Sequence, residues 1–352
     1  MNALSRRRYA VCLIGCAVAM IAVVGLSPGI GNQFQSVGFG QAWRSLGQRH
    51  LSPPPIEYQI AFHIRLPRTL LALQAGITLS LCGAVLQAIF RNALATPYTL
   101  GIASGGSLGA LIAIYAGFQV TVAGISSVSL CALAGAITVI GVVFILTRGT
   151  KRLTTNELLL AGVTLGMFSS AMMMMITYLS NVRETFAIIR WMMGSLDTIG
   201  HLRWTSSLPL VVPTWIVLIA VARPLNQYLL GDELAAARGV QVGRLQGACI
   251  FFCSLGTAAI VAICGPIGFV GLVVPHITAL LVGRDCRIHL PASAMIGGVF
   301  LVICDWVSQL AMSWVGALTG RQLGYSILPI GVVTAVIGVP IFLVLLHRRL
   351  AR

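Results

Sequence analysis

Acidic side chains are scarce in this chain of 352 residues, which has only eight. One of them, Asp305, lies deep inside an apolar run, LVICDWVSQL. An acid in such a run either relays protons or pairs with a basic group or a backbone amide. Two interpretations therefore stay open. Asp305 couples a process to an ion gradient, or it has a structural partner, such as an arginine near one end of the run.

Residues that could catalyse a reaction do not gather into a recognisable motif. The sequence contains no Walker A motif, no HExxH and no Ser/His/Asp set that falls on one side. The nine cysteines are scattered without a CxxC, so we read them as small apolar residues. His276, after Pro275, is a packing histidine or, alternatively, a metal ligand. We expect a chain that is no enzyme and holds no metal or cofactor.

The stretch GDELAAARGV, residues 231–240, is charged and rich in alanine. Gly231 and Gly239 bracket good helix formers, with Asp232 and Glu233 in the first turn and Arg238 in the last. The helix dipole favours acids in the first turn and a cation in the last turn, so the stretch predicts a short helix that ends at a glycine. It is either a solvated connection or a docking helix for a partner with a groove.

The tetrapeptide RLPR places Arg65 and Arg68 at the mouth of an apolar run. They either anchor the run at a membrane interface or bind carboxylates of an acidic external protein.

Polar residues also lie between apolar runs in two further stretches. In GAVLQAIFRNALATPYTLGIASGG, Gln87, Arg91 and Asn92 end one run. In RGTKRLTTNELLLAG, Thr154 and Thr155 cap a helix, or Thr155 and Asn156 line a pathway. The run MMMM, 172–175, packs in a core or against lipid, or offers a soft lining to a bulky apolar ligand.

The composition identifies the class of protein that must position these residues. Hydrophobic residues make up 57% of the chain and charged residues 9%, and the mean hydropathy is +0.93. A soluble domain carries about 25% charged residues. The chain therefore reads as an all-α polytopic membrane protein. The net charge is +15, and the basic residues lie mostly at the ends of apolar runs. There they set the membrane topology and meet lipid headgroups, so we expect no nucleic-acid binding.

Ten apolar runs are long enough to predict about ten transmembrane helices. Their approximate bounds are 10–28, 66–89, 97–117, 125–147, 157–179, 206–224, 246–264, 270–283, 292–313 and 328–347. With both termini in the cytoplasm, most lysines and arginines fall inside. The long outer segments are then 29–64 and 180–205, and the long inner one is 225–245.

The order of these motifs resembles the FecCD family, the permease subunits of ABC importers for iron–siderophores, haem and cobalamin. The similarity extends from about Arg65 to Arg349. It is carried by RLPRTLLAL, GAVLQAIFRNALATPYTLGIASG, LLLAGVTLG, WMMGSL, GDELAAARGV, GPIGFVGLVVPHI, LLVGRDCR, LPASAMIGG and LPIGVVTAVIGVPIFLVLL.

The resemblance implies the fold and the partners. It implies the type II ABC importer permease architecture with ten helices, in one transmembrane domain of residues 1–352 whose segment 225–245 couples to the ATPase. Two permease subunits, identical or paralogous, would join two cytoplasmic ABC ATPase subunits that bind ATP. A periplasmic or lipid-anchored binding protein would deliver the ligand to the bacterial inner membrane.

The resemblance also implies roles for single residues. The ATPase-coupling residues are Gly231, Asp232, Glu233, Ala236, Arg238 and Gly239. Arg65 and Arg68 match positions that dock the binding protein, and Asn92, Leu94, Thr155 and Asn156 match the translocation gate. The chain departs from the family pattern at Ala93, where proline is usual, and at Ile327, where glutamate is frequent. Gln309 replaces a docking arginine of some members, for which Arg321 is a candidate substitute.

The expected function is ATP-driven import of an iron chelate (siderophore or haem) or a cobalamin-like ligand by alternating access. The alternative is a secondary transporter that uses an ion gradient through Asp305.

Overall fold

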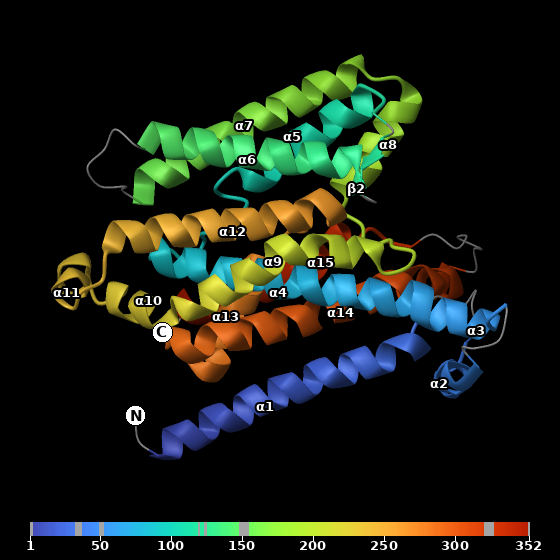
Figure 1. Cartoon of the computed structure of the whole chain (residues 1–352), viewed down its shortest axis with the longest axis horizontal. Helices are drawn as coiled ribbons and strands as arrows, with labels where there is room; N and C mark the ends of the chain where they lie inside the picture. The colour runs from blue at the N-terminus through green and yellow to red at the C-terminus, as the bar shows by residue number, and fades with distance from the viewer. Residues whose placement is uncertain are drawn as a thin grey trace.

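Ten apolar helices form the body of the protein and run roughly along its long axis (Figure 1). The computed structural model describes residues 3–31, 37–48, 53–118, 120–122, 125–147, 155–319 and 327–350. The ten helices follow the order of the ten predicted spans. They are α1 Ala3–Leu26, α4 Leu66–Ile89, α5 Ile102–Tyr115, α6 Ser127–Thr147, α7 Thr155–Leu179, α9 Leu202–Ala220, α12 Val242–Cys264, α13 Val270–Val282, α14 Cys286–Thr319 and α15 Ile330–Leu350.

Among the described residues, six of these helices are long and apolar enough to cross a membrane, and α5, α6, α13 and α15 have shorter apolar parts. The short elements lie between them. They are η1 Ser27–Gly29, α2 Phe39–Ser45, η2 Leu46–Gln48, α3 Ile56–Tyr58, η3 Gln59–Arg65, the β1 Thr121–Val122 and β2 Ile125–Ser126 hairpin, α8 Val182–Met192, α10 Ala222–Tyr228 and α11 Asp232–Ala237.

Helix α4 occupies the centre of the bundle, and 89% of its most apolar 18-residue stretch is buried. It packs against α14, α12, α13 and α9. Glycines allow these helices to approach closely: a Cβ on Gly76 would lie 2.2 Å from the carbonyl oxygen of Gly297 in α14. On Gly83 it would lie 1.9 Å from that of Gly271 in α13. Small residues at helix contacts are the usual solution in membranes, where backbones must meet to pack.

The predicted span boundaries differ from the helix ends by several residues, and two of the differences have a clear local cause. The span predicted from residue 97 begins at Ile102, because Pro97 lies in a series of turns and Gly101 adopts a positive φ of 74°. The span predicted as 206–224 is divided, since α9 ends at Ala220 and α10 begins at Ala222.

Helix α8 lies within the segment 180–205, which we predicted only as a long outer connection. Asn181 caps it, because its side chain accepts a hydrogen bond from the Glu184 amide at 2.9 Å. The Glu184 carboxylate accepts one in return from the Asn181 amide at 3.1 Å. This reciprocal capping box is a helix start signal that the sequence contains as N-x-x-E.

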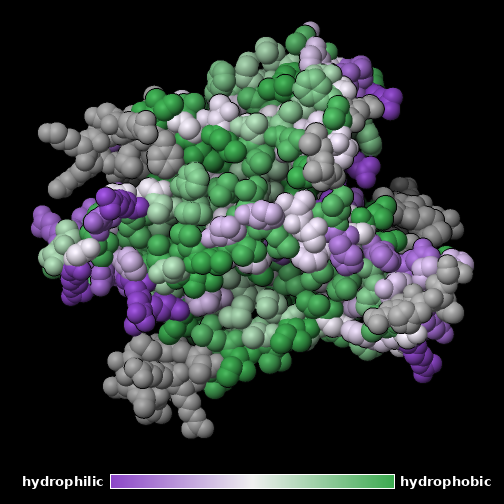
Figure 2. All heavy atoms as spheres, in the orientation of Figure 1, coloured by the Kyte–Doolittle hydropathy of each residue, from purple (hydrophilic) through white to green (hydrophobic). Residues whose placement is uncertain are grey.

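The polar groups lie at the two ends of the bundle. Figure 2 shows hydrophobic side chains over the middle of the molecule and hydrophilic ones at its ends. We call the end at which α4 begins the Arg65 end, and the end at which α4 finishes the Arg91 end. The start of α1, the end of α15 and α11 lie at the Arg91 end (Figure 1).

Candidate functional sites at the two ends of the bundle

Arg68 and Asp305 form a buried ion pair near the Arg65 end. Nε of Arg68 donates to Oδ1 and Oδ2 of Asp305 at 2.9 and 3.1 Å, and Nη2 lies 2.8 Å from Oδ1. Gln309, one turn further along α14, donates to Oδ2 at 2.7 Å. Asp305 is fully buried and Arg68 is 7% exposed. The expectation that Asp305 has an arginine as its structural partner is confirmed.

Asp197 contacts the same guanidinium from the loop between α8 and α9. Nη1 of Arg68 lies 2.7 Å from Oδ1 of Asp197, and Nη2 of Arg190 lies 3.6 Å from Oδ2. Arg203 donates to the backbone carbonyl of Asp197. Burial raises the pKa of Asp197, but Arg68, Ser195 and Arg190 together hold that pKa below its ordinary value. Asp197 therefore stays ionised at neutral pH.

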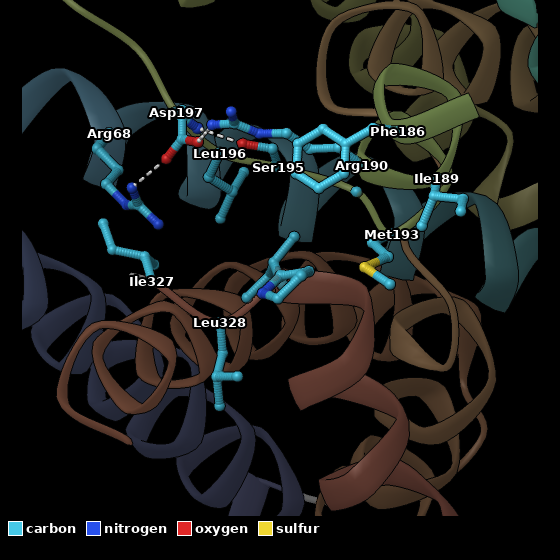
Figure 3. Close-up of a pocket in the computed structure, with 13 residues that line it drawn as sticks. Arg68, Phe186, Ile189, Arg190, Met193, Ser195, Leu196, Asp197, Ile327 and Leu328 are labelled. Atoms are coloured by element: carbon cyan, nitrogen blue, oxygen red, sulfur yellow. Dashed lines mark hydrogen bonds and ion pairs between the residues drawn. The ribbon is translucent and has the colours of Figure 1, made fainter. Parts of the chain in front are cut away.

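A cavity of about 520 Å³ opens beside this ion pair (Figure 3). Figure 3 shows Arg68 and Asp197 pointing toward one another, with Phe186, Ile189 and Met193 on the other side of the cavity. Its lining combines apolar side chains with few polar groups, which is typical of a small-molecule path or pocket. The lining residues come from α4, α8, the following loop and the start of α15.

Arg65 and Arg68, the predicted docking residues, are both buried. Nη1 of Arg65 donates to the carbonyl oxygens of Pro28 and Val37 at 2.9 and 3.1 Å. A Cβ on Gly31 would lie 2.4 Å from Nε of Arg65, so the backbone of Gly31 packs directly against the guanidinium. Arg65 thus connects the start of α4 to the segment after α1. The docking role of both arginines stays a prediction, and Arg321 lies outside the described residues.

The predicted ATPase-coupling residues form an exposed short helix at the Arg91 end. Gly231 has φ 124° before α11, and Gly239 has φ 84° after it. Asp232, Glu233, Ala236 and Arg238 are exposed, as is the apolar Leu234 at 53%. Among the six coupling positions none is buried, and Ala235 packs inward instead. The predicted short helix between two glycines is confirmed.

An arginine that sequence reasoning did not assign to the site connects α11 to the end of α4. Nη2 of Arg91 lies 2.6 Å from Oδ1 of Asp232 and donates to the Tyr228 carbonyl at 2.7 Å. The guanidinium also lies 4.3 Å from the centroid of the Tyr228 ring, a cation–π contact. The Tyr228 hydroxyl donates to the carbonyl of Ile89 at 3.1 Å. Arg91, with φ 46°, ends α4 in a left-handed turn.

The predicted gate residues follow directly. The Asn92 side chain accepts a hydrogen bond from the Leu94 amide at 2.9 Å, and Leu94 is 55% exposed. Thr155 and Asn156 begin α7, but their side chains lie outside the described ones. The turns that follow Leu94 pack against α7, the helix that Thr155 and Asn156 begin: a Cβ on Gly162 of α7 would lie 2.6 Å from the Thr99 carbonyl oxygen.

A second polar cluster joins α10 to the turn between α13 and α14. Asn226 donates to Oδ1 of Asp285 at 2.7 Å and accepts from the Cys286 amide at 2.9 Å. Arg287 lies 2.7 Å from Oδ2 of Asp285. The hydrogen bonds from Arg287 and Asn226 outweigh burial and lower the pKa of Asp285 to about 2. A cavity of about 330 Å³ lies nearby, lined by Arg91, Arg284, His276 and His289 among others.

Sequence reasoning did not assign Asp197, Arg91, Tyr228, Asn226 and Asp285 to any site. A signal for two of them, Asp197 and Asp285, was present, because acids are so scarce in this chain. Each aspartate pairs with an arginine: Asp197 and Asp305 with Arg68, Asp232 with Arg91, and Asp285 with Arg287. The described residues contain no group of three or more His, Cys, Asp and Glu side chains arranged for a metal ion.

Comparison with known proteins places this architecture. Residues 18–348 match the model of the FecCD transport family. The uncharacterized ABC transporter permease protein YvrB of Bacillus subtilis (strain 168) is 33% identical, over 98% of this chain and 96% of its own length. The vitamin B12 import system permease protein BtuC of Salmonella arizonae is 38% identical, over 82% of each chain. The cobalamin import system permease protein BtuC of Halobacterium salinarum is 37% identical, over 90% of this chain and 82% of its own.

One solved structure has the same fold, with a TM-score of 0.79 and 29% identity, over 96% of this chain and 98% of that one. It is described as an inward-facing conformation of a transporter of the metal-chelate ABC type. No finding supports the alternative of transport driven by an ion gradient through Asp305. The chain belongs to the FecCD transport family and is a transmembrane permease subunit of an ABC importer.

Proposed function

We propose that this chain is one of two permease subunits that carry cobalamin, or a related bulky metal chelate, into the cytoplasm by alternating access. The BtuC relatives, named for vitamin B12 and cobalamin import, support cobalamin as the first cargo to test. An iron chelate (siderophore or haem) is the second candidate, because the structural neighbour is described as of the metal-chelate type. This chain binds no cofactor, and ATP binds to the partner ATPases.

The Arg91 end faces the cytoplasm in this proposal, and the membrane is the bacterial inner membrane. The support is the distribution of basic residues: Arg6–Arg8 lie near the start of α1, and Arg348 and Arg349 lie in the last turn of α15. Positive charge on short connections is favoured on the cytoplasmic side.

The observation that carries the proposal is the connection between α11 and α4. Helix α11 is exposed, so it can contact a cytoplasmic ATPase, and Asp232 holds Arg91 at 2.6 Å. Motion imposed on α11 by ATP binding would reach Asn92 and Leu94, the residues next to Arg91. The gate would then respond to the ATPase through one short chain of contacts.

A second permease subunit, identical or paralogous, would cover one face of α7. Only 17% of the most apolar 18-residue stretch of this helix is buried. Its exposed side chains include large ones: Tyr178 is 88% exposed, Met174 75% and Met167 71%. The ligand would pass between the two subunits, beside the methionines of α7. A periplasmic or lipid-anchored binding protein would deliver it at the Arg65 end.

Co-purification from native membranes tests this function. The wild-type chain should bring down an ABC ATPase, and Glu233→Arg should weaken or abolish that association. Glu57→Arg is the matched control, because it makes the same charge change at the opposite end. If no ATPase accompanies the wild-type chain in a gentle detergent, the proposed partner is wrong.

Uptake into proteoliposomes then identifies the cargo. The complete complex should accumulate labelled cobalamin, and a ferric siderophore and haem should be taken up more slowly. Faster uptake of either iron chelate would move the assignment to that class.

A further inference from the structure

Three arginines from three helices converge on Asp197. Arg68 from α4 and Arg190 from α8 face its carboxylate, and Arg203 from α9 donates to its carbonyl. The only other acid in this cluster, Asp305, is fully buried and takes Nε and Nη2 of Arg68. Asp197 takes the remaining nitrogen, Nη1, and its side chain is 47% exposed.

The two carboxylates on Arg68 are therefore not equivalent. Asp305 is fixed inside α14 by the bidentate contact and by Gln309. Asp197 lies on a loop whose backbone is anchored on both sides, by Ser195 to the Cys264 carbonyl and by Gly200 to the His63 carbonyl. Its side chain can turn away by rotation about its own bonds. Nη1 of Arg68 would then face the cavity without a carboxylate partner, and Arg190 would add a second positive charge beside it.

Arg68 is the predicted docking residue for an acidic side chain of the binding protein. We propose that Asp197 competes with that side chain and occupies Nη1 of Arg68 in the free permease. A carboxylate of the partner would replace Asp197 on Nη1 of Arg68, beside Arg190. The inference rests on the proposed function, in which a binding protein docks at the Arg65 end. It adds a competitor within the chain, which sets how tightly the partner binds.

The surroundings favour a protein over a small carboxylate as the occupant. Exposed apolar side chains line the same cavity as Arg68 and Arg190: Phe186 at 70%, Ile189 at 45% and Met193 at 40%. Arginine among exposed aromatic and aliphatic residues is typical of protein interfaces. A site for a small anion needs no such rim.

A peptide-binding measurement on the full-length chain in nanodiscs tests the competition. The probe is the peptide Glu-Gly-Glu-Gly-Glu, with its Gln counterpart as the neutral reference. If Asp197 occupies the site about nine-tenths of the time, removing it tightens apparent binding about tenfold. We expect this from Asp197→Asn and also from Asp197→Ala. Adding Arg190→Gln to Asp197→Asn should lose most of the gain.

Glu57→Gln is the control, because it removes a negative charge from the same end without touching the cluster. An equal gain from Glu57→Gln, or no gain from either Asp197 variant with normal helical content, would overturn the proposal. Succinate serves as the small carboxylate for comparison. If it binds as tightly as the peptide, the occupant of the site is a small anion and not a protein side chain. ATPase co-purification is independent of this measurement, so its failure would reject the proposed function without affecting the carboxylate site.

Discussion

Arg91, two residues after the end of the central helix α4, pairs with Asp232 in the first turn of the exposed helix α11, with 2.6 Å between Nη2 and Oδ1. The two residues are 141 positions apart in sequence, and both side chains are almost half exposed. An exposed pair of this kind contributes about 0–1 kcal/mol to stability. In the proposed function the value of this pair is mechanical, because it would connect α11, the segment proposed to contact an ATPase, to the residues proposed as the gate.

Arg91→Gln should uncouple transport from ATP hydrolysis without unfolding the protein. We expect cargo uptake to fall at least about tenfold, since the connection to the gate is lost, whereas the thermal midpoint changes little because the pair is exposed. Uptake and ATPase activity in proteoliposomes measure this. Arg223→Gln, at another exposed position of the same end, should leave uptake within about twofold. Equal losses in both variants would contradict a specific role for Arg91.

Asp305→Ala should destabilise the protein strongly, because it removes the bidentate partner of a buried arginine. Breaking a buried ion pair on one side costs about 3–5 kcal/mol, and Asp197 would offset part of this. The double variant Arg68→Met/Asp305→Leu should recover most of the stability. Thermal unfolding in detergent checks both. If the double variant is as unstable as Asp305→Ala, the assignment of Asp305 as the structural partner of Arg68 is wrong.

Gly76→Ala and Gly83→Ala should each reduce the folded yield, because the new methyl group meets a backbone carbonyl. Overpacking of this kind costs about 1–3 kcal/mol. Gly141→Ala is the matched control in α6, since nothing lies within 4 Å of its Cβ. It should be neutral or slightly stabilising, given that alanine favours helix by up to about 1 kcal/mol. Fluorescence-detected size-exclusion chromatography of the three variants compares the yields.

The pattern of apolar runs was enough to predict the ten helices in order, because membrane helices are set by length and hydropathy. The same pattern missed α8, since an amphipathic helix lacks a continuous apolar run and its signal is the local Asn181–Glu184 cap. The short helix at Asp232–Ala237 was predicted from its glycines and its charges. Its contact with Arg91 was not, because a pairing across 141 residues leaves no local trace.

The docking prediction for Arg68 shows a second limit of sequence reasoning. Arg68 of RLPR binds carboxylates, whereas Arg65 donates to the carbonyl oxygens of Pro28 and Val37. The docking role of both arginines stays a prediction, because the sequence does not say whose carboxylates Arg68 binds. In the structure they belong to Asp305 and Asp197 of the same chain.

Asp285 should support the turn between α13 and α14 at every pH above about 4, its ordinary pKa. Its folded-state pKa is lowered to about 2, so its stabilising contribution is complete above the ordinary value and is lost as pH falls toward about 2. The difference in thermal midpoint between wild type and Asp285→Asn should therefore stay constant from pH 8 to about pH 5. It should shrink below about pH 4. A difference that instead disappears between pH 7 and 5 would show that the carboxylate is not held by Arg287 and Asn226.

Cysteines placed on α7 should report the second permease subunit. In a cysteine-free background, Met174→Cys and Tyr178→Cys should cross-link between subunits in native membranes, because these exposed positions face the proposed partner. Val18→Cys is the control: it is 58% exposed on α1, which packs on α14. Lipid around both helices would give equal, low cross-linking and would contradict the proposed interface. Cross-linking confined to α7 would place the ligand path beside Met172 to Met175, where unbranched thioethers adapt to a bulky chelate.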